Sequence, residues 1–171
     1  MKGLVTVLLV VGLGIGAYVY FNRPLEIPDL VMKDADGGQV NLDDMLGDKE
    51  ALLLVVLLPG CTLSRFSLEA VKAVHDRFAD RLAVVGLLAG NNSQAQQYAE
   101  QQQVSFPVYG VRSAADPFAV NELIEKIGES GCGRATVRGG TVAVIDREHM
   151  MLLRLEGKEV RNLGEQLDDL L

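Results

Sequence analysis

Cys61 is the residue of this chain best placed to do chemistry. It stands in LLPGCTLSRF, residues 57–66, between an apolar run and a segment with helical periodicity. The start of a helix offers unpaired backbone N–H groups and a positive dipole end, which stabilise a thiolate. The thiolate is the nucleophile in disulfide exchange. The residue three positions on is Ser64, so Cys61 has no local CxxC partner.

Cys132 is the second of the two cysteines and lies in ESGCGRATVRGG. In an oxidising compartment, two such thiols form a disulfide, act as a redox couple, or do each in turn. A structural zinc site needs four ligands at tight spacing, and the chain offers only His75 and His149 as imidazoles. We therefore predict no metal site and no cofactor. The net charge of −7 argues against a nucleic-acid partner, because phosphate binding needs a basic face.

The N-terminus predicts a membrane anchor. Residues 3–22 carry no charge, and a helix of that length spans about 30 Å, the thickness of a bilayer core. The alternative is a cleaved signal peptide, for which Gly14, Gly16 and Ala17 offer small residues. Both interpretations export the remaining chain. We expect an anchor at 1–23, a linker at 24–28 and one domain at 29–171, located at the inner membrane with the domain in the periplasm or outside.

The elements that must position the cysteines alternate between strands and helices. The run at 51–58, ALLLVVLL, is apolar without interruption, which is typical of a strand buried on both faces. Alternation of this kind predicts an α/β fold with a central mixed sheet flanked by helices. The predicted order is a hairpin (30–32 and 40–42), a strand (51–58), a helix (62–78), a strand (81–90), a helix (93–103), a short edge strand (104–110), a helix (116–128), a second hairpin (141–146 and 151–157) and a final amphipathic helix (160–171).

Four segments resemble the thioredoxin-like superfamily. They are PDLVMKDADGGQVNLDDMLGDKEALLLVVLL before Cys61, VVGLLAGNN, VSFPVYG, and TVAVIDREHMMLLRLEG near the end. The chain is similar to the membrane-anchored redoxins of that superfamily, of the TlpA and ResA kind, and to their peroxiredoxin relatives. The resemblance implies a thioredoxin-like fold and thiol-disulfide oxidoreductase activity on exported protein thiols or disulfides.

The sequence departs from that pattern at the active site. The family's W-C-x-x-C appears here as PGCTLS, and the expected cis-proline six residues before Asp146 is Gly140. Peroxiredoxins carry a threonine where Leu58 stands, and a copper-delivering relative would need a cysteine at Arg65. For each of these three activities (dithiol exchange, peroxide reduction and copper delivery), a residue that the family usually provides is therefore missing.

Cys132 lies just upstream of the segment that reaches the active cysteine in this fold. The resemblance therefore implies a redox couple in which Cys61 attacks and Cys132 resolves. A structural disulfide and two inert thiols stay open as alternatives. We expect an oxidoreductase; a thiol peroxidase and a catalytically degenerate binding or assembly module are the alternatives. The residues expected to contact substrate are Pro59, Gly60, Thr62, Ser64, Gly139 and Gly140.

Overall fold

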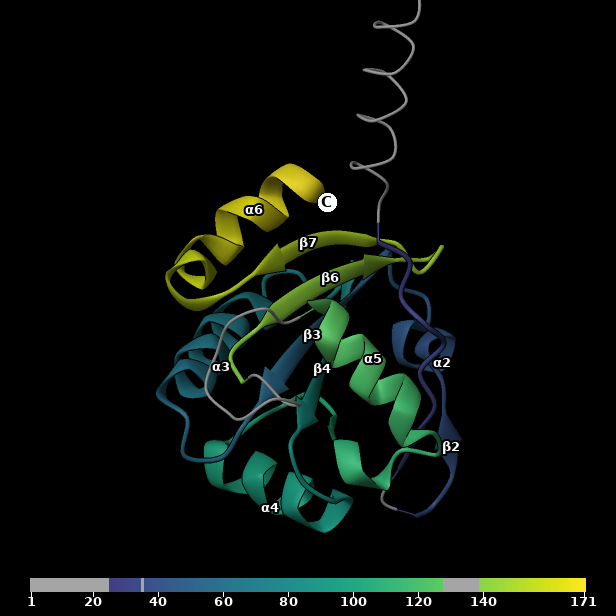
Figure 1. Cartoon of the computed structure of the whole chain (residues 1–171). Coiled ribbons are helices and arrows are strands. Elements are labelled where there is room, and N and C mark those ends of the chain that lie inside the picture. The colour runs from purple at the N-terminus through teal and green to yellow at the C-terminus, as the bar shows by residue number, and fades with distance from the viewer. Residues whose placement is uncertain (1–24, 35, 128–138) are drawn as a thin grey trace, which may run out of the picture.

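A five-stranded mixed sheet forms the centre of the domain (Figure 1). The computed structural model describes residues 25–34, 36–127 and 139–171. The strand order is β5-β4-β3-β6-β7, with β3 parallel to β4 and antiparallel to β6. This arrangement confirms the predicted α/β fold with a mixed sheet. The strands are β3 (Ala51–Leu57), β4 (Leu82–Leu88), β5 (Val108–Gly110), β6 (Val142–Asp146) and β7 (Met151–Leu155).

Helices cover both faces of the sheet, which explains the uninterrupted apolar run of β3. Leu53 and Val55 face a core that includes α3 (Thr62–His75) and α6 (Leu163–Leu170), whereas Leu52 and Leu54 face the other core. That second core includes α2 (Leu42–Leu46) and α5 (Pro117–Ile127). Since successive side chains of a strand point to opposite faces, each face of β3 needs apolar residues. The remaining elements are β1 (Met32–Lys33), β2 (Gln39–Val40), α4 (Asn92–Gln102) and the 3-10 turns η1 (Val111–Ser113) and η2 (Gly157–Asn162).

Two local elements differ from the prediction. The hairpin β1-β2 is shorter, and α2 follows it directly because Asn41 and Asp44 form a reciprocal capping box. The edge strand β5 begins only at Val108. Pro107 has no N–H to donate, and its carbonyl accepts from Gly86 at 2.9 Å, so pairing starts at that point.

Residues 25–27 belong to the folded domain, although the sequence assigned 24–28 to a linker. The Ile27 N–H donates to the His149 carbonyl at 2.9 Å, and the Met151 N–H donates to the Leu25 carbonyl at 2.9 Å. The Ile27 side chain is buried in the core. The segment therefore adds an extended stretch beside the start of β7. Two neighbouring prolines concealed this pairing in the sequence.

The predicted anchor at 1–23 lies outside the described residues. Across the part of the chain that is described, no helix combines the length and the apolar character needed to cross a bilayer.

Replacing Ile27 tests whether this segment carries stability. Ile27→Ala should lower the free energy of unfolding by about 2–5 kcal/mol, because it deletes a buried side chain that the core cannot fully close around. Denaturant unfolding of the protein measures the loss. Asp29→Ala, at an exposed position in the same segment, should change stability little. Equal, small effects of both variants would restore the linker interpretation.

Candidate redox site

A tight turn between β3 and α3 places Cys61. The Cys61 N–H donates to the Leu58 carbonyl at 3.1 Å, and Gly60 has a φ of +77°. Proline at the second position and a positive-φ glycine at the third are the residues that a type II turn requires. The sequence Pro59-Gly60 thus fixes the direction in which the chain enters the helix. Pro59 and Gly60 are both exposed.

Cys61 is the N-cap residue of α3. Its carbonyl accepts the Arg65 N–H at 3.1 Å, and its side chain forms no cap hydrogen bond. The N–H groups of residues 62–64 have no acceptor among the described residues. These groups and the helix dipole favour negative charge on a reduced Cys61 sulfur. The position predicted from the sequence, at the junction of strand and helix, is confirmed.

Cys61 is disulfide-bonded, and the described residues contain no free cysteine. Its side chain is buried, with a relative exposure of 7%. Its Sγ lies 4.0 Å from the Gly139 carbonyl oxygen, a contact that becomes a weak hydrogen bond only after reduction restores the S–H group. Cys132, the predicted partner, lies outside the described residues.

Ser64 occupies the place of the family's second cysteine and has a structural contact there. It is fully buried, and its Oγ accepts the Leu58 N–H at 2.9 Å. The hydroxyl therefore ties the first turn of α3 to the end of β3. A buried side chain with this partner offers no surface to a client, so the substrate contact predicted for Ser64 finds no support in its position.

The main chain at Gly139 and Gly140 lies directly against the first turn of α3. A Cβ on Gly139 would fall 2.2 Å from the Ser64 Oγ, and one on Gly140 would fall 2.8 Å from the Leu63 carbonyl carbon. Gly140 also has a φ of +97°, a conformation that L side chains rarely adopt. Only glycine fits this approach at either position. Both glycines are buried, so their role is close packing beside Cys61.

Ser67 holds this glycine segment in place. Its Oγ donates to the Gly140 carbonyl at 2.6 Å, and both groups are buried. On the other side, the Gly140 N–H donates to the Val56 carbonyl at 2.7 Å. Sequence reasoning missed Ser67, although its spacing places it one turn beyond Ser64 on the same helix.

A pocket of about 250 Å³ opens beside Cys61. Gly60 and Thr62, both predicted to contact substrate, line it together with Cys61. Arg65, Tyr98 and Gln102 complete the lining. Burial, and secondarily the Glu69 carboxylate, raises the pKa of Tyr98, so its phenol stays protonated and able to donate. Arg65 lies four residues after Cys61, the spacing of neighbours on a helix surface, which is the signal that could have found it.

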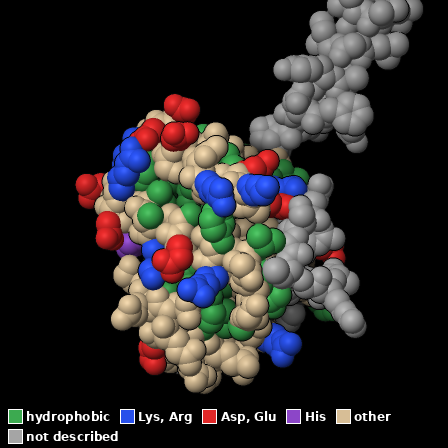
Figure 2. All heavy atoms as spheres, turned by 90° about the vertical axis from the view of Figure 1, so that its left-hand side faces the viewer, with side chains coloured by type: hydrophobic (Ala, Val, Ile, Leu, Met, Phe, Trp, Pro, Cys, Tyr) green, Lys and Arg blue, Asp and Glu red, His purple; other side chains and the backbone are tan. Residues whose placement is uncertain are grey.

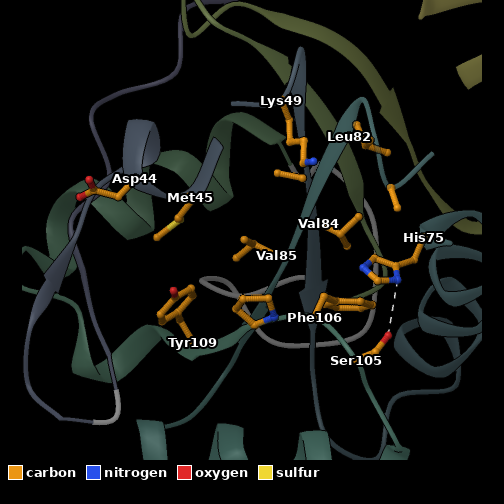
Figure 3. A pocket seen from close by; sticks show the side chains of 13 residues that line it. Asp44, Met45, Lys49, His75, Leu82, Val84, Val85, Ser105, Phe106 and Tyr109 are labelled. Carbon is orange, nitrogen blue, oxygen red and sulfur yellow. Dashed lines mark hydrogen bonds between the residues drawn. The ribbon is translucent and has the colours of Figure 1, made fainter. Parts of the chain in front are cut away.

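A second pocket, of about 280 Å³, lies along the edge of β4 away from Cys61 (Figure 3). His75 and Ser105 stand on one of its walls, where the Ser105 Oγ is 3.4 Å from the His75 Nδ1. The Asp76 carboxylate contacts that same Nδ1 at 3.0 Å. A serine–histidine–acid relay needs the two partners on different ring nitrogens. Ser105, His75 and Asp76 therefore do not have the geometry of such a relay.

The chain is a thioredoxin-like redoxin. Three features define it: the order of the strands in the sheet, the cysteine at the N-cap of α3, and the segment before β6 that packs against that helix. The sequence pattern of the AhpC/TSA family matches residues 25–132, which is more than half of the chain. The chain belongs to the AhpC/TSA family.

Solved structures show the same fold at low sequence identity. A thiol:disulfide interchange protein of the thioredoxin family from Chlorobium tepidum TLS is 20% identical, with a TM-score of 0.60 over 86% of this chain and 97% of that one. A DsbF homologue from Corynebacterium diphtheriae is 18% identical, with a TM-score of 0.63 over 86% and 88%. A thiol:disulfide interchange protein from Bacteroides sp. is 16% identical, with a TM-score of 0.62 over 86% and 90%. No curated protein matches the chain in sequence.

Substitution of Gly140 tests the close approach to α3. Gly140→Ala should cost more than about 2 kcal/mol of stability, because a positive-φ strain of about 1–2 kcal/mol adds to overlap with Leu63. Gly37→Ala is the matched control, since Gly37 has a φ of +87° but open space around its Cβ position. Chemical denaturation compares the two variants. Equal losses of stability in the two variants would mean that the contact with α3 adds nothing to the cost of the substitution.

The Ser67 hydrogen bond gives a second test at the site. Ser67→Ala should destabilise the domain by about 1–3 kcal/mol, because the buried Gly140 carbonyl loses its donor. Ser93→Ala, at an exposed position on α4, should leave the unfolding midpoint unchanged. A Ser67→Ala variant as stable as the parent would show that water or another donor replaces the hydroxyl.

Proposed function

We propose that the protein is a thiol-disulfide oxidoreductase whose redox centre is a Cys61–Cys132 disulfide. The observation that carries the proposal is a disulfide-bonded Cys61 at the N-terminus of α3, beside an open pocket. Cys132 is the only other cysteine of the chain and is therefore the proposed partner. The thioredoxin-like fold and the interchange proteins that share it support this class of activity.

The proposed reduction of a client disulfide proceeds in two exchanges. The Cys61 thiolate attacks one client sulfur, the client S–S bond breaks, and a client thiolate leaves with a mixed disulfide remaining on Cys61. Cys132 then gives its proton to solvent and attacks the Cys61 Sγ. The Cys61–Cys132 bond forms, and the second client sulfur leaves as a thiolate. Two electrons pass from the protein to the client, and the client thiolates take up protons. A dithiol reductant then restores the reduced protein. Run backwards, the same steps oxidise a client dithiol and leave the protein reduced, and a disulfide oxidant restores the Cys61–Cys132 bond.

The local structure supports each role of Cys61. The unpaired N–H groups at the start of α3 favour the thiolate both as attacking and as leaving group. Gly60 and Thr62 form the rim over which a client sulfur approaches. Gly139 supplies a backbone carbonyl near the sulfur without a side chain that would block it.

The proposed location is the inner membrane. The uncharged run at 3–22, flanked by Lys2 and Arg23, supports a single-pass anchor with the domain in the periplasm or outside. Such a tether would keep the enzyme close to exported protein thiols and disulfides, which are the proposed partners.

Membership of the AhpC/TSA family favours a thiol peroxidase as the second candidate. In that reaction the Cys61 thiolate attacks a peroxide oxygen, the O–O bond breaks, and the other oxygen leaves as hydroxide or alkoxide and takes up a proton. Cys132 then attacks the sulfenic acid sulfur, the disulfide forms, and water is released. Leu58 stands where peroxiredoxins carry a threonine, and its side chain offers no hydroxyl for the peroxide.

Single-cysteine variants test the proposal. Reduced Cys132→Ser protein, mixed with an oxidised client peptide, should accumulate a mixed disulfide at Cys61, because the resolving thiol is gone. Cys61→Ser should form no adduct and should lose turnover by at least an order of magnitude. Intact-mass spectrometry detects the adduct, and an insulin-reduction assay measures turnover.

Non-reducing peptide mapping of the parent protein should recover a peptide pair joined through positions 61 and 132. Both thiols free under mild oxidant would reject the redox couple. Peroxide consumption that depends on Cys61, without insulin reduction, would favour the peroxidase. Neither activity above the Cys61→Ser background would leave a binding module.

A further inference from the structure

The first turn of α3 is hollowed on both sides. On one side lies the pocket shared by Cys61 and Arg65. On the other lies a pocket of about 230 Å³ whose lining includes Leu63, Phe66 and η2. Thr62 lines both pockets, so they adjoin at the residue that follows the reactive cysteine. A client segment whose sulfur reaches Cys61 would therefore find one recess on either side of Thr62.

Three cations that form no ion pair within the described residues line the two recesses. Arg65 lines the first pocket, and Lys158 and Arg161 line the second. None of the three is within ion-pair distance of a carboxylate in the described part of the chain. All three side chains are exposed. Elsewhere several cations are neutralised, for example Arg77 by Asp168 and Arg81 by Glu50.

The nearest acid on the same helix is already engaged. Glu69 lies one turn beyond Arg65, but its carboxylate contacts the Lys72 ammonium at 3.5 Å. Lys72 in turn donates to the Gln102 carbonyl at 3.0 Å, which fixes it between α3 and α4. Within the described part of the chain, no carboxylate therefore neutralises Arg65 beside Cys61. In a chain of net charge −7, this local excess of cations stands out.

The 230 Å³ pocket beside η2 combines apolar side chains with the cations Lys158 and Arg161. Leu63 and Phe66 supply the apolar surface, and the Arg161 guanidinium lies 5.3 Å from the centre of the Phe66 ring. That cation–π contact holds the charge above the aromatic ring. On this side of the molecule, Figure 2 shows hydrophobic side chains at the surface between basic and acidic ones. The pocket suits an apolar side chain with a negative charge nearby.

We propose that the clients are protein segments in which the reactive cysteine is flanked by an acidic residue, which binds Arg65, and by an apolar residue, which enters the Leu63–Phe66 pocket. The inference rests on the proposed function and specifies its substrate class. Charge complementarity to three unpaired cations selects an acidic segment, and two recesses on either side of Thr62 select an extended one. The chemistry remains the exchange already described, so no further oxidant or reductant is required.

Matched peptides test the preference. Three peptides of equal length carry a disulfide-bonded cysteine with leucine on one side and glutamate, glutamine or lysine on the other. The rate of exchange with reduced protein should fall in that order, with about a threefold to fivefold gap between glutamate and glutamine, as expected for an exposed ion pair. Arg65→Glu should invert the order, and Arg65→Lys should keep it. Raised salt should reduce the difference in exchange rate between the glutamate and lysine peptides.

Arg147→Glu is the matched control, because it makes the same charge change at the opposite end of the sheet. It should leave the order of the three peptides unchanged. Leucine→serine in the glutamate peptide should slow exchange, and Phe66→Ala should remove that difference. Equal rates for all three peptides, with exchange still present, would overturn the client preference and leave the proposed function intact. No exchange with any peptide would overturn the proposed function.

Binding without chemistry keeps the inference testable apart from the redox step. A fluorescent peptide with serine in place of its cysteine should bind the oxidised protein more tightly with glutamate than with lysine, as measured by anisotropy. Arg65→Glu should invert that difference. A small carboxylate-bearing disulfide that exchanges as fast as the glutamate peptide, and is insensitive to Phe66→Ala, would assign the site to low-molecular-weight thiols and reject protein clients.

Discussion

The close approach of the Gly139–Gly140 main chain to the first turn of α3 is the constraint on which the site depends. It brings the start of β6 against the helix that Cys61 caps, and it leaves room for no Cβ. The contact is held by a buried hydrogen bond from Ser67 and continues into the β3–β6 ladder. Because these bonds are buried, the position of the Gly139 carbonyl beside the sulfur is fixed by the same forces that hold the sheet together.

This constraint gives a physical reason for the two departures from the family's active-site pattern. A proline at position 140 would need a φ near −65°, whereas Gly140 has a φ of +97° and its N–H donates to Val56. The side chain at position 64 points into the same contact, where its hydroxyl accepts the Leu58 N–H. Serine and glycine thus serve the packing of this junction. A second thiol has to come from another part of the chain.

Periodicity revealed the elements, and local chemistry revealed the position of Cys61, because both depend on residues close in sequence. The uninterrupted apolar run of β3 and the Pro59-Gly60 turn are of this kind. Contacts between distant segments left no such signal. The pairing of Ile27 with His149, the Ser67 bond to Gly140 and the placing of Tyr98 beside Cys61 arise only when the chain folds. The sequence therefore located Cys61 and its neighbours Gly60 and Thr62, but not the part of the pocket wall that Tyr98 and Gln102 supply from α4.

Electrostatics around Cys61 differs in sign from the protein as a whole. Charges further apart than about 8 Å are largely screened at physiological salt, so the net charge of −7 acts weakly on a client already in contact. Near groups then dominate the field at the sulfur. Among the described residues these include the N–H groups of α3 and Arg65, which no described carboxylate pairs. Both favour negative charge, on the Cys61 thiolate and on the client alike. In the proposed function, a single arrangement of positive groups both activates the nucleophile and selects which segments reach it.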